Sequence, residues 1–237
     1  MIFIITYITF FNLRIIIILK DSKCINFEMF SKTKYFSGLT VTDLKPELTT
    51  IISRIYLKVG SWEKTKSIVI KNNELQTRSN STGIRLEREL RQRLKNLSEQ
   101  QLILLAKGSI NDRLAMTWLG VLKRIKLVSE LSHELLLEKI EGSDPILRRS
   151  DMAEFYKKKE KQFSEFKNLS DTSHKRINSI VLSMLREMGL LVGESKTKGD
   201  LGTLQRYNLS TQSRELIDKE GEIYSGFLLK SINKGGG

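Results

Sequence analysis

From residue 42 onward, apolar residues recur at spacings of three and four, which is the period of an amphipathic helix. The clearest stripe consists of Ile177, Ile180, Val181, Met184, Leu185 and Met188. Similar helical faces are expected within residues 46–59, 61–70, 84–94, 98–107, 111–126, 132–141 and 150–166. With two prolines and 40% hydrophobic residues in the chain, the pattern predicts a mainly α fold, a bundle of helices.

Two stretches of the chain share one design, a polar, hydroxyl-rich turn followed by a basic amphipathic helix. They cover residues 78–94 and 170–191. Hydroxyl groups and unpaired N–H groups at a helix start suit the phosphate backbone of a nucleic acid, particularly with cations along the outer face. The pattern therefore predicts two helix-turn-helix-like units.

A pair of short strands is expected directly after the second unit. Residues 190–192 have the composition of a strand, residues 193–202 form a polar, glycine-punctuated hairpin tip, and residues 204–209 alternate like a returning strand. Helix, turn, helix and a strand pair with a basic tip is the order of a winged helix. The alternative is a plain surface hairpin after a helical bundle.

The residues expected to contact DNA are hydroxyls and cations on both helix starts and on the hairpin tip: Arg78, Ser81, Thr82, Arg85, Arg88, Thr172, Ser173, Lys175, Arg176, Ser179, Lys196 and Lys198. In the first helix, however, Glu87 and Glu89 lie four residues before Arg91 and Arg93, so these arginines can instead form ion pairs on a solvated face. The second helix contains fewer acids, and we favour it if only one unit binds DNA. Four lysines, at 157, 158, 159 and 161, are expected on the outer face of the preceding helix.

The domain organisation follows from these elements. We expect a hydrophobic extension over residues 1–28, an N-terminal helical domain over 29–142, a winged-helix-like domain over 143–234 and a tail over 235–237. The extension begins with 19 very apolar residues, close to the roughly 20 needed to span a bilayer, although Arg14 interrupts them. It is a membrane anchor, an element packed on the body, or sequence upstream of the natural start. Because Met29 resembles a cytoplasmic start, we favour the last interpretation and expect a cytoplasmic protein.

Charge and chemistry narrow the possible functions. Forty Lys and Arg residues against 27 Asp and Glu residues give a net charge of +13, which favours a polyanionic partner, either nucleic acid or an anionic membrane surface. Only Cys24, His133 and His174 could supply thiolate or imidazole ligands, so neither a zinc finger nor an intramolecular disulfide can form. Phosphate-binding loops, nucleophile elbows, zinc-protease helices and dinucleotide fingerprints are missing. We therefore expect no enzyme activity, cofactor, metal or small-molecule substrate.

Over residues 34–210 the order and wording of the chain resemble the BrxA family of BREX (bacteriophage exclusion) phage-defence systems. The resemblance rests on residues 34–39, the helix at 47–60, Trp62 and Glu63, and the stretches 79–93 and 173–191. Such a resemblance implies a non-enzymatic DNA-binding protein with helix-turn-helix or winged-helix parts. The family has also been described as an inner-membrane protein, but no segment after residue 28 is long and apolar enough for that.

The sequence therefore predicts a double-stranded DNA-binding component of a phage-defence system that works beside other BREX proteins. One alternative is a helical scaffold whose basic faces bind an acidic partner protein of the same system. Another is an adaptor tethered to a membrane through residues 1–19. RNA in place of duplex DNA also remains open, because helical bundles can recognise RNA by its shape.

Overall fold

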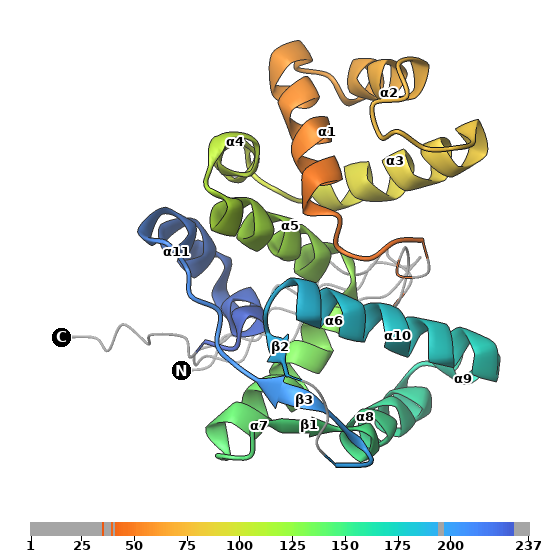
Figure 1. Ribbon diagram of the computed structural model, residues 1–237, viewed down its shortest axis with the longest axis vertical. Helices are drawn as coiled ribbons and strands as arrows, with labels where there is room; N and C mark the ends of the chain where they lie inside the picture. Colours follow the sequence, from red (N-terminus) through yellow and green to blue (C-terminus); the bar gives the residue numbers. More distant parts are fainter. Residues whose placement is uncertain (1–34, 36–38, 40, 194–196, 230–237) are drawn as a thin grey trace, which may run out of the picture. The chain divides into compact units, whose positions relative to one another are not determined.

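The computed structural model describes Tyr35, Leu39 and residues 41–193 and 197–229 (Figure 1). The predicted extension over residues 1–28, the tail and Lys196 lie outside these residues. Within the described part the fold is mainly helical and includes a small antiparallel sheet, as the hydrophobic pattern predicts. None of the described helices is long and apolar enough to cross a membrane.

The first half of the described chain consists of helices packed around α5. They are α1 (Pro46–Val59), α2 (Trp62–Lys71), α3 (Asn80–Leu94), α4 (Glu99–Lys107) and α5 (Ile110–Arg124). Helices α1, α3 and α4 all contact α5, and α2 packs on α1 and α3. Serine N-caps begin several of these helices, and Ser98 and Gln101 form the expected capping box. The turn before α3 is shorter than expected, because Ser79 caps a helix that begins at Asn80 rather than at Ile84.

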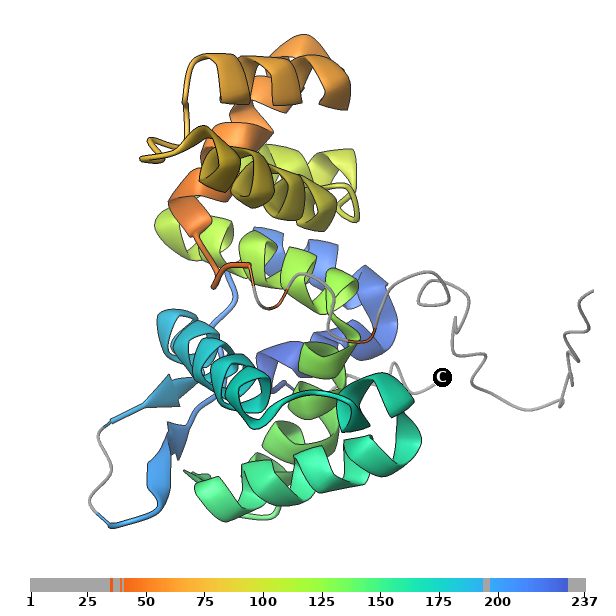
Figure 2. The same cartoon turned by 90° about the vertical axis from the view of Figure 1, so that its right-hand side faces the viewer.

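The second half consists of further helices and a three-stranded sheet, which α8 and α10 contact. Its helices are α6 (Lys126–Leu131), the π-helix η2 (Ser132–Leu137), α7 (Glu138–Glu141), α8 (Arg149–Gln162), α9 (Ser164–Lys167), α10 (Asp171–Glu187), α11 (Thr211–Ile217) and the 3₁₀ segment η3 (Asp218–Phe227). Its strands are β1 (Ile146–Arg148), β2 (Leu191–Val192) and β3 (Asp200–Leu204), in the antiparallel order β1-β3-β2. Figure 2 shows β2 and β3 beside α10.

The strand pair departs from the sequence prediction in one respect. Leu191 and Val192 pair with Leu204 and Thr203, but the returning strand begins at Asp200, inside the predicted hairpin tip, and ends at Leu204. Leu201 and Leu204 are buried, so packing selects this segment although its glycines are typical of a turn. At Gly202 the value of φ is +142°, and a Cβ atom there would lie 2.9 Å from the Val192 carbonyl oxygen.

One continuous hydrophobic core joins the two halves. Trp118 on α5 is fully buried, and its Nε1 donates a hydrogen bond to the carbonyl oxygen of Gly226, 2.8 Å away. Helix α5 also contacts α6, α11 and η3. The core includes residues from Tyr35, before α1, to Leu228, after η3. The predicted domain boundary at residues 142–143 stays a prediction.

Candidate nucleic-acid interface

Helix α10, the second predicted recognition helix, is built as its sequence suggests. Ser170 has extended backbone angles, and its Oγ accepts a hydrogen bond from the Ser173 backbone N–H, 3.3 Å away. The apolar stripe is buried at Ile177, Val181, Met184, Leu185 and Met188. Four predicted contact residues remain exposed, namely Thr172, Lys175, Arg176 and Ser179, and Ser173 is half-buried. Because positions 172, 175, 176 and 179 are spaced by three and four, they share one face of the helix.

A groove of about 410 Å³ runs between α8 and α10 and ends at β3. It is lined by Arg149, Met152, Ala153, Tyr156, His174, Lys175, Asn178, Ser179, Leu182, Arg186 and Leu201. None of these lining residues carries a carboxylate. The groove therefore presents three permanent cations above a floor of buried methionine, tyrosine and leucine side chains.

Hydrogen bonds hold the walls of this groove in place. The Tyr156 hydroxyl donates to Oδ1 of Asn178 over 3.4 Å, which links α8 to α10, and burial raises the pKa of that phenol. Arg186 donates to the carbonyl oxygen of Leu201 over 3.1 Å and so fixes β3 against α10. The backbone N–H of Arg149 donates to the Gly199 carbonyl oxygen, 2.8 Å away, so the start of α8 is tied to the strand pair.

Other hollows on the described surface differ in charge. The groove between α1 and α5 includes Glu47 and Glu187, and the one beside Trp62 includes Glu99. A larger hollow on the other side of α8 includes four carboxylates. The net positive charge of the chain therefore does not explain why the α8–α10 groove lacks acids, because these other hollows contain them. The lack of acids is a local property of that groove.

The predicted hairpin tip contributes one described cation. Lys198 is exposed, two residues before β3, whereas Lys196 lies outside the described residues. Since Gly199 bonds to the start of α8, Lys198 stands close to the rim of the α8–α10 groove. Lys198 thus lies toward the end of the groove that Arg149 and Arg186 line, whereas Lys175 and Ser179 line the groove nearer the start of α10.

In the first predicted unit, on α3, the cations near the start of the helix are exposed, but those further along form ion pairs. Arg78, Ser81, Thr82, Arg85 and Arg88 are all exposed at or near its start. The ion pairs of the alternative interpretation are confirmed further along the helix, where Arg91 pairs with Glu87 at 2.6 Å and Arg93 pairs with Glu89 at 3.2 Å. The solvated face that it expected for them is wrong, because Glu87, Glu89 and Arg93 are buried.

The prediction that Arg93 belongs to the outer basic face of α3 is wrong. Arg93 is only 1% exposed, and its guanidinium donates to the carbonyl oxygens of Thr42 and Asp43 at 2.9 and 2.6 Å. It therefore anchors the segment before α1. The outer cations of this unit are Arg78, Arg85 and Arg88.

The two candidate units form separate groups. Helix α3 packs on α1, α2 and α5, whereas α10 contacts β2. In Figure 1 both helices begin toward the right-hand side of the view. The α10 group adjoins the α8–α10 groove, which is lined by the further cations Arg149 and Arg186.

Several residues of this site do not follow from the sequence pattern alone. Arg149, Tyr156, Asn178 and Arg186 line the α8–α10 groove but were not among the predicted contact residues. The two consecutive arginines at 148 and 149, just before a helix, are a signal in the sequence for a cationic surface there. The packing of α8 beside α10, however, cannot be predicted from sequence spacing.

Within the described residues, no cluster of three or more His, Cys, Asp or Glu side chains could hold a metal ion.

Comparisons with known proteins agree with the resemblance noted in the sequence. The model of one family, BrxA, matches residues 33–221. The fold is similar to that of a crystal structure of an uncharacterized protein from Magnetospirillum magneticum, with a TM-score of 0.66 and 15% identity. That similarity covers 82% of this chain and 97% of the other. The search of curated proteins found no match.

Proposed function

The chain belongs to the BrxA family of BREX phage-defence systems. We propose that it is the component of such a system that binds double-stranded DNA, without acting as an enzyme. One observation carries the proposal: the α8–α10 groove and the adjoining outer face of α10 present cations and hydroxyls, with no carboxylate among the groove's lining residues. Family membership also favours other BREX proteins as partners.

The chemistry of this surface matches a phosphate backbone. Arg149, Lys175 and Arg186 supply positive charge along the groove, and the hydroxyls of Thr172 and Ser179 can donate to phosphate oxygens. Backbone contacts of this kind position a protein on a duplex, and the exposed face of α10 is long enough to lie in or against a groove of the DNA. Lys198 would then contact a flanking phosphate.

Salt dependence of binding to a labelled duplex tests the proposal. The logarithm of the affinity should fall linearly with the logarithm of salt concentration, with a slope of about −0.9 per phosphate neutralised. The double variant Lys175→Ala/Arg176→Ala should bind more weakly, and its slope should be shallower by up to about 1.8. Fluorescence anisotropy at several salt concentrations measures both quantities.

A matched control removes two exposed lysines elsewhere. Lys107 at the end of α4 and Lys219 in η3 are both exposed, and neither lines the α8–α10 groove. The variant Lys107→Ala/Lys219→Ala should keep the wild-type slope. If both double variants reduced binding equally, the attraction would be general and α10 would not be the contact surface.

Competition and product analysis separate the remaining possibilities. Unlabelled duplex DNA should compete better than single-stranded DNA or duplex RNA of the same length. Stronger competition by RNA would redirect the assignment to RNA. DNA recovered after incubation with Mg²⁺ or Mn²⁺ should be intact, and cleavage that disappears on removing the metal would contradict the non-enzymatic proposal.

A further inference from the structure

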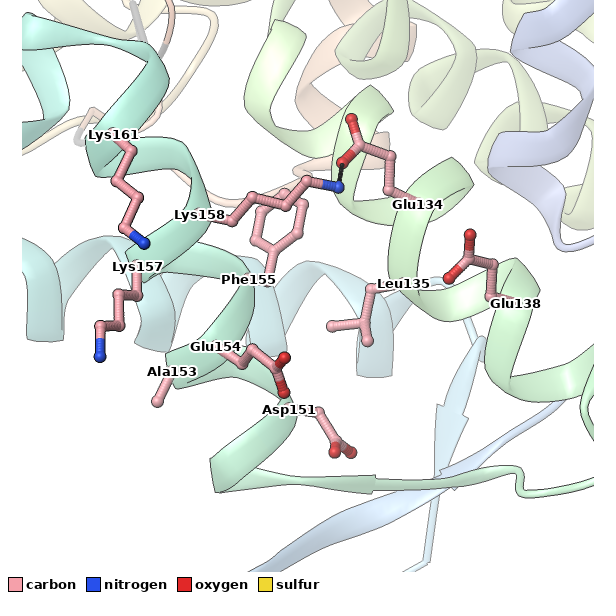
Figure 3. A pocket seen from close by; sticks show the side chains of 10 residues that line it. All are labelled: Glu134, Leu135, Glu138, Asp151, Ala153, Glu154, Phe155, Lys157, Lys158 and Lys161. Carbon is pink, nitrogen blue, oxygen red and sulfur yellow. Dashed lines mark hydrogen bonds and ion pairs between the residues drawn. The ribbon is translucent and has the colours of Figure 1, made fainter.

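Helix α8 separates two hollows that differ in charge, and Ala153 lines both of them. The hollow between η2, α7 and α8, of about 800 Å³, contains acids and lysines together (Figure 3). There Lys158 bonds to Glu134 at 2.9 Å, and Glu154 lies beside Asp151. An anion entering that hollow would meet carboxylates, whereas the α8–α10 groove has none among its lining residues. Of the two, the α8–α10 groove is therefore the one suited to an anionic ligand.

The α8–α10 groove also has an apolar floor. Four buried side chains line it, namely Met152, Tyr156, Leu182 and Leu201. Phosphate oxygens gain nothing from such a surface, because contact with it removes their water without supplying hydrogen bonds. A phosphate backbone against α10 thus explains the cations and hydroxyls of the groove but leaves its floor without a ligand group.

The polar groups around this floor are donors, and several have no partner in the chain. The exposed side chains of Arg149 and Lys175 form no ion pair with any described residue. Oδ1 of Asn178 accepts a hydrogen bond from the Tyr156 hydroxyl, while its Nδ2 amine has no hydrogen-bond partner among the described residues. The groove therefore combines cations, an amide donor and an apolar surface.

A nucleotide with an unpaired base matches this combination. Its base has an apolar face and polar edges, and its phosphate is an anion, so proteins hold unpaired bases with apolar side chains, hydrogen-bonding groups and cations. A base inside a duplex cannot present its face, because the neighbouring base pairs cover it. The groove volume of about 410 Å³ also lies within the range of pockets that hold small ligands, roughly 300–1,000 Å³.

The groove adjoins the proposed duplex-binding surface. Lys175 and Ser179 line the groove, and they also belong to the exposed face of α10 that includes Thr172 and Arg176. A DNA strand that leaves a duplex on that face can therefore pass directly into the groove.

We infer that the α8–α10 groove binds an unpaired nucleotide of DNA, with the base on the apolar floor and the phosphate at the cations. The inference rests on the proposed binding of duplex DNA at α10 and adds the part of the DNA that enters the groove. A free nucleotide offers the same chemistry, but it lacks the duplex that would hold it at α10.

Duplexes with different ends test the inference on the full chain. Fluorescence anisotropy compares a blunt duplex with duplexes that carry two unpaired thymidines on the 5′ or the 3′ strand, and with the same overhangs made abasic. At least one thymidine overhang should raise the affinity about tenfold over the blunt duplex, because the floor takes up a base. The matching abasic overhang has the same phosphates but no base, so it should lose most of this gain.

Equal affinities for the thymidine and abasic overhangs would overturn the inference, while salt-dependent binding of the blunt duplex would leave the proposed function standing. A chain that bound no duplex at any salt concentration would instead refute the proposed function, and the inference with it. The two failures are therefore distinguishable.

A groove-filling variant tests the location. Ala153→Trp places a bulky side chain at an exposed position that lines the groove, and it should bring the ratio of overhang to blunt affinity close to one. Glu154→Trp is the matched control, because the next residue of α8 is also exposed but lines only the hollow of Figure 3, so the ratio should stay as in wild type. Thermal melts verify that both variants are folded. A ratio that survived in Ala153→Trp would overturn the assignment to this groove.

Free thymidine 5′-monophosphate separates the two sources of the ligand. It should displace the overhang duplex only at concentrations far above that of an unlabelled overhang duplex, because it lacks the duplex contacts. Displacement at equal concentrations would overturn the assignment to DNA and would identify a free nucleotide as the ligand.

Discussion

Lys159 provides a sharp test of the packing around α8. The sequence predicts this lysine on the outer face of the helix, together with Lys157, Lys158 and Lys161. That prediction is wrong for Lys159, because its side chain points inward to Glu130 and Glu134 and is 1% exposed. We expect Lys159→Met to unfold more readily than any substitution of its exposed neighbours.

The expected loss follows from the contacts that the amine makes. Removing one partner of a buried ion pair costs roughly 3–5 kcal/mol, because it leaves an uncompensated charge behind. Here both carboxylates keep another amine, Lys126 at 3.3 Å from Glu130 and Lys158 at 2.9 Å from Glu134. The loss should therefore lie at the lower end, about 3 kcal/mol, which corresponds to a fall in Tm of roughly 6–12 °C for a chain of this size.

The pH dependence of stability adds a second measurement. Partial burial alone would raise the pKa of the Glu134 carboxyl, but hydrogen bonds from Lys159 and Lys158 outweigh burial and hold the pKa below its usual value. A carboxyl with a depressed folded-state pKa stabilises the protein above its unfolded pKa, and that contribution is lost as the pH falls through the folded value. The advantage of wild type over Lys159→Met should thus be full at neutral pH and should shrink below about pH 4.

Urea unfolding followed by circular dichroism measures both effects, and Lys161→Met is the matched control. Lys161 is exposed on the same helix, so its substitution should change the free energy of unfolding by no more than about 0.5 kcal/mol. Equal stability of Lys159→Met and Lys161→Met would refute the buried ion cluster. A difference that did not change with pH would refute the assigned role of Glu134.

Three further substitutions test other contacts, each by urea unfolding. Arg93→Met should cost about 3–5 kcal/mol, because it leaves Glu89 buried without its cation, whereas Arg88→Met on the exposed face should be nearly neutral. Asp112→Ala should cost about 3 kcal/mol at neutral pH, because this carboxylate accepts hydrogen bonds from three serine hydroxyls. Despite partial burial, those hydrogen bonds lower the pKa of Asp112. The cost of the substitution should therefore shrink as the pH falls below about 3.9. Gly226→Ala should cost about 1–3 kcal/mol, because the added methyl would overlap the Leu122 side chain.

Much of the helical structure could be predicted because its determinants are local. Ser61 and Ser98 cap the helices that they precede, and the stripe that includes Ile177 and Met184 is buried as its spacing requires. The ion pair between Glu87 and Arg91 follows from their separation by four residues. In each case the interacting groups lie within one or two helical turns, so the sequence alone identifies them.

The parts that could not be predicted depend on contacts between distant segments. Strand β1 has three residues and no alternating pattern, and it becomes a strand only because β3, more than fifty residues later, pairs with it. Lys159 looks like its exposed neighbours until α6 and η2 bring carboxylates to it. For the same reason the sequence does not predict the α8–α10 groove, since Arg149 and Arg186 come to line one groove only in the folded chain.

The net charge of +13 overstates the surface available to a polyanion. Arg91, Arg93, Lys123 and Lys159 are engaged by carboxylates within the fold, and Lys158 pairs with Glu134. Between α8 and α10, by contrast, Arg149, Lys175 and Arg186 line a groove with no carboxylate among its lining residues. Binding of a phosphate backbone depends on this local arrangement, because at ordinary salt the electrostatic interaction between exposed charges is largely screened beyond about 10 Å. Substitutions at α10 should therefore weaken nucleic-acid binding far more than equal changes of net charge elsewhere.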